Sequence, residues 1–118
     1  MKTFLAVYIG SASALEKSEW SKTTDESELK RLQNAGIEAW GNWATANQAS
    51  IVDHGTPLGK TKRASAQGIS DIKNAITAYT IVQAESHEAA ASMFEQHPHF
   101  MIFPGDSVEI MECLPMPR

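Results

Sequence analysis

The chain has 118 residues, of which 42% are hydrophobic and 20% are charged, as in an ordinary globular domain. This length predicts a single domain, residues 1–118, that can bury a core without metal or disulfide cross-links. The net charge of −4 opposes a general attraction to nucleic acid or to an anionic membrane surface, so we expect neither as a partner.

The single cysteine, Cys113, excludes an internal disulfide and favours a reducing compartment, so we predict a cytoplasmic protein. Lys2, the apolar run 4–9 and the triplet 12–14 also have the pattern of a very short signal peptide. The same run makes an ordinary first strand, which we favour because the leader would be unusually short. No stretch approaches the roughly 20 apolar residues that span a bilayer.

The first strand is expected over residues 3–9, and both of its faces are apolar. The alternating side chains are Phe4, Ala6 and Tyr8 on one face and Leu5, Val7 and Ile9 on the other. A strand of this kind must be covered on both sides.

Residues 10–22 are rich in Ser and Ala and are interpreted as a connection with at most a short turn of helix. Asp25 and Glu28 then have capping-box spacing at the start of a long helix, which is predicted to end at residues 46–48. Gly36 inside this helix indicates either a close approach to the sheet or a break.

The remaining sequence alternates short apolar strands with turn residues and one further helix, which Ser86 caps and Pro98 ends. The predicted elements are strands at 49–54, 78–84 and 107–113, an exposed strand or hairpin arm at 60–66, a loop with a helical turn at 69–77, a helix at 87–96 and a loop at 99–106.

This order predicts an α+β domain of ferredoxin-like fold, βαββαβ, with a four-stranded antiparallel sheet, both helices on one side and an inserted β arm. Two helices cover one sheet face only, and monomers avoid exposing a large apolar face. We therefore expect a homodimer in which two sheets pack face to face and bury about 1,600 Å² or more. Coverage by the chain's own tail and inserted arm is the alternative.

Five segments have a characteristic order and spacing between about Trp40 and Pro115. They are Ala39–Trp43, Ile51–Gly59, Tyr79–Ser86, Pro98–His99 and Val108–Ile110. Together they resemble the YCII-related (DGPF-type) domain family. The resemblance implies a ferredoxin-like fold dimerised as an α/β barrel, in a family largely without assigned activity. Enzyme-like members carry a His on the first long helix, whereas this chain has no His before residue 48.

Asp53 and His99 are the candidate catalytic pair. Asp53 ends the second strand at a Gly- and Pro-rich bend, and His99 follows Pro98. A carboxylate that orients an imidazole and raises its pKa makes a general base near neutral pH. The alternatives are an Asp53 side chain that accepts N–H groups of its own turn and a His99 that bonds to the backbone.

Three histidines, His54, His97 and His99, raise the possibility of a metal site with Asp53 as a further ligand. Their spacing matches no known metal motif, and Pro98 constrains two of the rings, so we predict no metal. No phosphate loop or dinucleotide fingerprint is present either, so we predict no cofactor.

The candidate ligand pocket is expected to be formed by aromatic and polar side chains around the same bend. Its predicted members are Tyr8, Trp40, Trp43, His54, Pro57, Phe100 and Glu109. Trp40 and Trp43 can equally be core residues, and Glu109 can equally lie in a dimer interface.

Three functions agree with these features. The first is a homodimeric protein that binds an unknown small molecule, or an accessory protein, without chemistry. The second is an enzyme that uses Asp53 and His99 for proton transfer on a small organic substrate. The third, a role in transcriptional control through a protein partner, rests on analogy with the family alone.

Overall fold

The computed structural model describes residues 1–117 of the chain. A four-stranded antiparallel sheet forms the centre of the molecule. Its strands are β1 (Lys2–Ile9), β2 (Ile51–Asp53), β5 (Ile76–Ala84) and β6 (Ser107–Glu112), in the spatial order β2-β5-β1-β6. The two central strands are β1 and β5, which are the first and third of these four strands in the sequence. This is the ferredoxin-like order. The predicted α+β architecture and antiparallel sheet are therefore confirmed.

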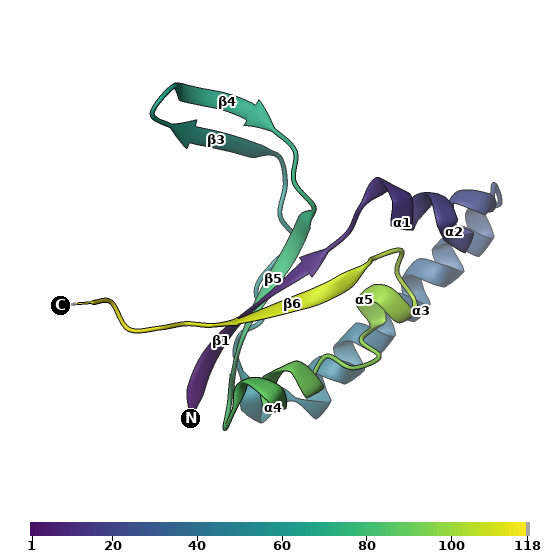
Figure 1. Cartoon of the computed structure of the whole chain (residues 1–118). Helices are drawn as coiled ribbons and strands as arrows, with labels where there is room; N and C mark the ends of the chain where they lie inside the picture. Colours follow the sequence, from purple (N-terminus) through teal and green to yellow (C-terminus); the bar gives the residue numbers. More distant parts are fainter. Residues whose placement is uncertain (118) are drawn as a thin grey trace.

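The helices lie together on one side of the sheet (Figure 1). Their bounds are α1 (Ala12–Lys17), α2 (Glu19–Lys22), α3 (Glu26–Ala46), α4 (His87–Ser92) and α5 (Pro98–Met101), with a 3-10 turn at Gln48–Ser50. The core between sheet and helices consists of Phe4, Ala6, Tyr8, Val82, Ala84, Ala90 and Phe94, with Trp40 and Trp43 packed against it. None of residues 1–117 belongs to a helix both long enough and apolar enough to cross a membrane.

Three local expectations need correction. Residues 10–22 form two short helices, because Ser11 accepts the Ala14 N–H as an N-cap. Residues 69–77 were expected to be a loop with a helical turn but contain β4 (Gly68–Ile72), because Gly68 adopts a φ of 106° that closes a hairpin. The helix from His87 ends at Ser92, and Pro98 begins α5 instead of preceding a loop.

The inserted arm is a two-stranded hairpin formed by β3 (Thr61–Ser65) and β4, which pair with each other in a separate sheet. Figure 1 shows the arm extending from the body on the side away from α3 and α4. The Cα radius of gyration is 16.3 Å, against about 13.5 Å for a compact chain of this length. The arm and the extended C-terminal tail account for this elongated shape.

The sheet face opposite α3 and α4, here called the open face, is formed by the alternate residues of each strand. Phe4, paired with Val82, faces the helices, so Leu5 and Val7 face the other way with their partners Ile81 and Tyr79. On β6 the open face carries Met111, which is 43% exposed, and Glu109, which is also exposed. Neither α3 nor α4 covers this largely apolar face, on which Val7 is buried and Leu5 and Ile81 are half-buried.

Candidate functional site

A cavity of about 630 Å³ lies at the end of the sheet where β1 stops and β5 begins. Its walls are largely apolar and include Leu15, Trp40, Tyr79, Phe103 and Pro104. The polar lining residues are Ser11, His54, Thr56, Thr77 and His99. Its volume and its few convergent polar groups are typical of a site for a small organic molecule.

His99 is the most constrained polar group of this cavity. Its Nε2 lies 2.7 Å from the carbonyl oxygen of Ile9, at the end of β1. A carbonyl oxygen only accepts, so Nε2 carries the proton, and in the neutral ring Nδ1 is left as an acceptor. Among residues 1–117 no hydrogen bond to Nδ1 is formed. His99 therefore offers one oriented acceptor, or a second donor once the ring is protonated.

Hydrogen bonds from neighbouring residues also fix the backbone of His99. Pro98 begins α5, and His97 caps this helix by accepting the His99 N–H at 3.0 Å. The His99 carbonyl accepts the N–H of Gly105 at 3.0 Å. A Cβ atom at Gly105 would overlap the imidazole of His99, so the close approach of this loop requires glycine.

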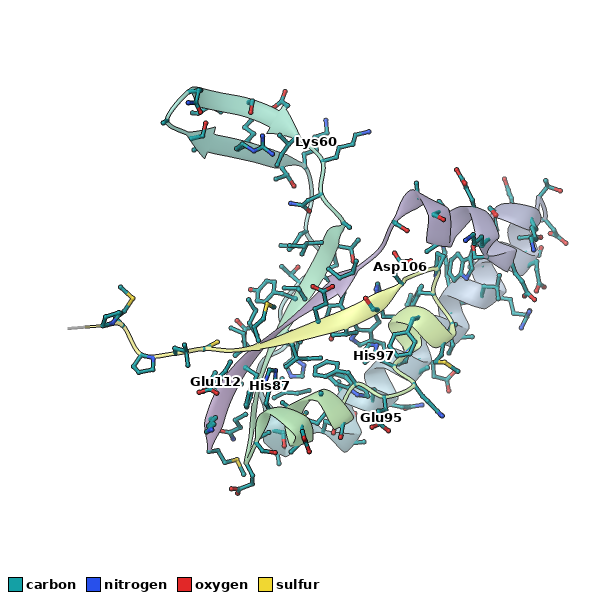
Figure 2. All side chains as sticks on the ribbon, in the orientation of Figure 1. Lys60, His87, Glu95, His97, Asp106 and Glu112 are labelled. Atoms are coloured by element: carbon teal, nitrogen blue, oxygen red, sulfur yellow. The ribbon has the colours of Figure 1, made fainter. Side chains whose placement is uncertain are left out.

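His97 is a core residue and does not line the cavity. Its ring is fully buried and packs perpendicular to Trp40 and Trp43, with centroid distances of 4.5 and 4.6 Å, and Figure 2 shows it inside the body beside α5. Burial, supported by the neighbouring charge of His99, lowers the pKa of His97 to about 4. The ring is therefore neutral at physiological pH, with its proton on Nε2.

Hydrogen bonds engage part of the histidine set that could hold a metal ion. Nδ1 of His97 accepts the His99 N–H, and Nε2 of His99 donates to the Ile9 carbonyl, so Nδ1 of His99 is the ring nitrogen of this pair that keeps a free lone pair. Within the described chain, no group of three or more His, Cys, Asp or Glu side chains gathers to hold an ion.

The loop from Asp53 to Pro57 forms the opposite wall of the cavity. Asp53 Oδ1 accepts the N–H of Gly55 at 2.8 Å, and Gly55 has a φ of 71°. A Cβ atom at Gly55 would collide with the carbonyl of Tyr79, so only glycine permits this contact. Pro57 then pairs with Ala78 of β5. Asp53 thus fixes the turn that places the wall, and its own exposed side chain lies outside the cavity.

Two hydrogen bonds, which link Tyr8, Thr80 and the carbonyl of His54, connect this wall to the core. Thr80 Oγ1 donates to the His54 carbonyl at 3.1 Å, so the 2.9 Å bond between Thr80 and Tyr8 must have the Tyr8 hydroxyl as its donor. Burial raises the pKa of Tyr8 to about 12, despite the opposing hydrogen bond to Thr80. Tyr8 remains a neutral donor and links the core to the His54 backbone.

The predicted site residues fall into three groups. His54, Pro57 and Trp40 line the cavity together with His99, whereas Asp53 stands behind its wall and forms no hydrogen bond to His99 among residues 1–117. The other predicted members lie elsewhere: Tyr8 and Trp43 in the core, Phe100 beside a separate hollow of about 300 Å³, and Glu109 on the open face.

Several lining residues were not predicted, notably Tyr79 and Phe103. Phe103 precedes the Pro104-Gly105 turn, which could have indicated that the chain folds back onto His99. Tyr79 offered no such signal, because its contact with the loop at Gly55 joins parts of the chain that are distant in sequence.

No family model matches the chain, and no curated protein matches it in sequence. Among solved structures, it is similar to 5-chloro-2-hydroxyhydroquinone dehydrochlorinase from Burkholderia phenoliruptrix AC1100, determined in complex with 2,5-dihydroxybenzoquinone. The TM-score is 0.52 at 18% sequence identity, over 92% of this chain and 90% of that one. At this identity the likeness demonstrates a shared fold.

Proposed function

We propose that this chain is a YCII-related protein that forms a homodimer and binds a small, flat organic molecule in the cavity beside His99. The observation that carries the proposal is the combination of apolar walls with one imidazole oriented by the Ile9 carbonyl. A ligand with aromatic faces and a hydroxyl group that donates to Nδ1 of His99 satisfies both features. The solved structure of similar fold holds a hydroxylated quinone.

The surface area of the chain supports the homodimer. The isolated chain exposes 8374 Å², whereas a compact monomer of 12.9 kDa exposes about 6,300 Å². The excess of about 2,000 Å² exceeds the roughly 800 Å² that each partner buries in a standard interface. The apolar open face, with the half-buried Leu5 and Ile81, is the part of this surface that a second sheet would cover.

The second candidate function is proton transfer on the same ligand, with His99 as the base. An imidazole whose Nε2–H is held by a carbonyl can accept a proton at Nδ1 without turning. Asp53 would contribute to this chemistry through the position of its turn, since its carboxylate is bonded to the Gly55 N–H. The fold shared with a dehydrochlorinase supports this candidate only as an analogy.

Binding of 2,5-dihydroxybenzoquinone, followed by calorimetry and by quenching of tryptophan fluorescence, tests the proposal. We expect His99→Gln to weaken binding at least about tenfold, because one oriented hydrogen bond in an apolar cavity is lost. His87→Gln is the matched control: Nε2 of His87 also lies 2.7 Å from a carbonyl, that of Ile110, but His87 is outside the cavity. Equal affinity of wild type and His99→Gln, or the absence of any binding, would refute the site.

A further inference from the structure

The arm, residues 60–73, differs from the rest of the chain in charge. It contains Lys60, Lys62, Arg63 and Lys73 against the single carboxylate of Asp71, a net charge of +3. Because the whole chain carries −4, the other residues together carry −7. Lys60 lies at the base of the arm (Figure 2). A basic projection on an acidic body is complementary to a second copy of the same chain.

The arm has little support from its own chain. Its two strands pair only with each other, and its one internal ion pair, Lys62 with Asp71 at 2.6 Å, is largely exposed. Such a pair contributes at most about 1 kcal/mol, and an isolated two-stranded hairpin is marginally stable in water. Ile69 on the arm is also 77% exposed. These features are typical of a segment that docks on a partner.

The size of the open face indicates why the arm is needed in a dimer. With strands about 4.8 Å apart and a rise of about 3.3 Å per residue, the face measures roughly 20 by 20 Å. The flat projection of this face is about 400 Å², and contacts of the arm would add to the accessible area that such an interface buries. The arm lies on the open side of the sheet (Figure 1), so it can supply the remaining contact.

Glu109 gives the arm a specific target. It lies on β6 opposite Val7, on the open face, and a second sheet packed there would bury its carboxylate. A buried carboxylate without a cationic partner is strongly destabilising. Arg63 of the arm forms no ion pair within residues 1–117 and can bind a carboxylate with two hydrogen bonds.

From these observations we infer that the arm of each copy clasps the other copy, with Arg63 of one paired to Glu109 of the other. This inference rests on the homodimer proposed above. The contact occurs twice by two-fold symmetry, since each copy contributes both the arm and the carboxylate. Ile69, the cross-strand partner of Ala64, lies on the opposite face of the arm from Arg63 and takes no part in this ion pair.

Charge reversal in the full-length protein tests the contact, with the dimer dissociation constant measured by sedimentation equilibrium. We expect Arg63→Glu and Glu109→Lys each to raise the dissociation constant at least about tenfold, because like charges then face each other. The double variant restores the pair and should return to within about threefold of wild type. Added salt should weaken the wild-type dimer.

Lys30→Glu is the matched control, since it makes the same change in net charge on α3, away from the arm. Two further controls replace exposed apolar side chains away from the ion pair: Ile69→Ser, on the opposite face of the arm from Arg63, and Ile37→Ser, at a 65% exposed position of α3, should both leave the dimer unchanged. Far-ultraviolet circular dichroism verifies that each variant is folded.

Three results would count against the clasp. If Arg63→Glu weakens the dimer no more than Lys30→Glu does, the arm contact is wrong. The face-to-face dimer is unaffected by that result. Single variants that weaken the dimer without rescue in the double variant overturn the pairing of Arg63 with Glu109. A wild-type monomer at about 100 μM overturns both the clasp and the homodimer, while the ligand titration tests the cavity separately.

Discussion

Gly36 lies directly against the phenyl ring of Phe103, where the middle of α3 passes under the loop that forms one cavity wall. The ring of Phe103 also packs on Trp20, with a centroid distance of 5.4 Å. The Trp20 Nε1–H donates to the carbonyl of Ile102 at 2.9 Å. Phe103 is thus clamped between α2 and α3, and α3 continues through Gly36 without a break.

This contact predicts opposite effects for two glycines of one helix. A Cβ atom at Gly36 would overlap Phe103, so Gly36→Ala should lower the free energy of unfolding by about 1–3 kcal/mol. A Cβ atom at Gly41 meets nothing within 4 Å, so Gly41→Ala should raise it by up to about 1 kcal/mol. Urea denaturation measures both. A stabilised Gly36→Ala protein would show that the ring is free to move.

Asp53 separates the two candidate functions. If its carboxylate only holds the turn, Asp53→Asn should bind the ligand as wild type does, because the amide oxygen can still accept the Gly55 N–H. Asp53→Ala removes this acceptor and should weaken binding several-fold. Calorimetry with 2,5-dihydroxybenzoquinone measures both. If a reaction is found and Asp53→Asn abolishes it while binding is unchanged, the carboxylate has a chemical role beyond the turn.

The lowered pKa of His97 predicts that the protein loses stability in mild acid. Its pKa falls from 6.5 to about 4 on folding, mainly through burial. Between these values the unfolded chain binds a proton that the folded chain does not. The free energy of unfolding therefore decreases as the pH falls from 6.5 to 4, by about 3 kcal/mol in total. Above pH 6.5 the residue contributes no pH dependence.

The variant His97→Asn isolates this contribution. Asn can keep the cap on the His99 N–H but does not titrate. The variant should be less stable than wild type at pH 7, because a buried ring is lost, and its stability should change less between pH 6.5 and 4. Denaturant titrations across this range measure the difference. Parallel pH profiles of the two proteins would mean that His97 charges equally in both states.

Much of the fold could be predicted because apolar periodicity and caps determine it. The apolar run of β1, the Asp25 cap of α3 and the Ser86 cap of α4 are local signals, and each element lies where its signal indicated. The second arm strand was missed because Gly68–Ile72 has few apolar residues and little burial. Its conformation depends on pairing with β3, which a local pattern does not report.

The candidate site was only partly predictable, since its residues come from five separate segments of the chain. His54, Pro57 and His99 were found because titratable residues beside Gly or Pro indicate a constrained bend. The alternative for Asp53, a bond to an N–H of its own turn, is the arrangement observed, whereas the φ of Gly55 and its contact with Tyr79 gave no local signal. These are long-range properties of the folded sheet.

The segments that flank the arm meet where the Leu58 N–H donates to the Thr77 carbonyl at 2.8 Å, next to the pairing of Pro57 with Ala78. The hydrogen bonds of the central sheet are therefore complete without the hairpin. The hairpin is an insertion between two segments that already pair with each other. Its length and sequence can diverge without changing the register of β5 against β1. Related chains could thus acquire different assembly partners while keeping the same ligand-binding body.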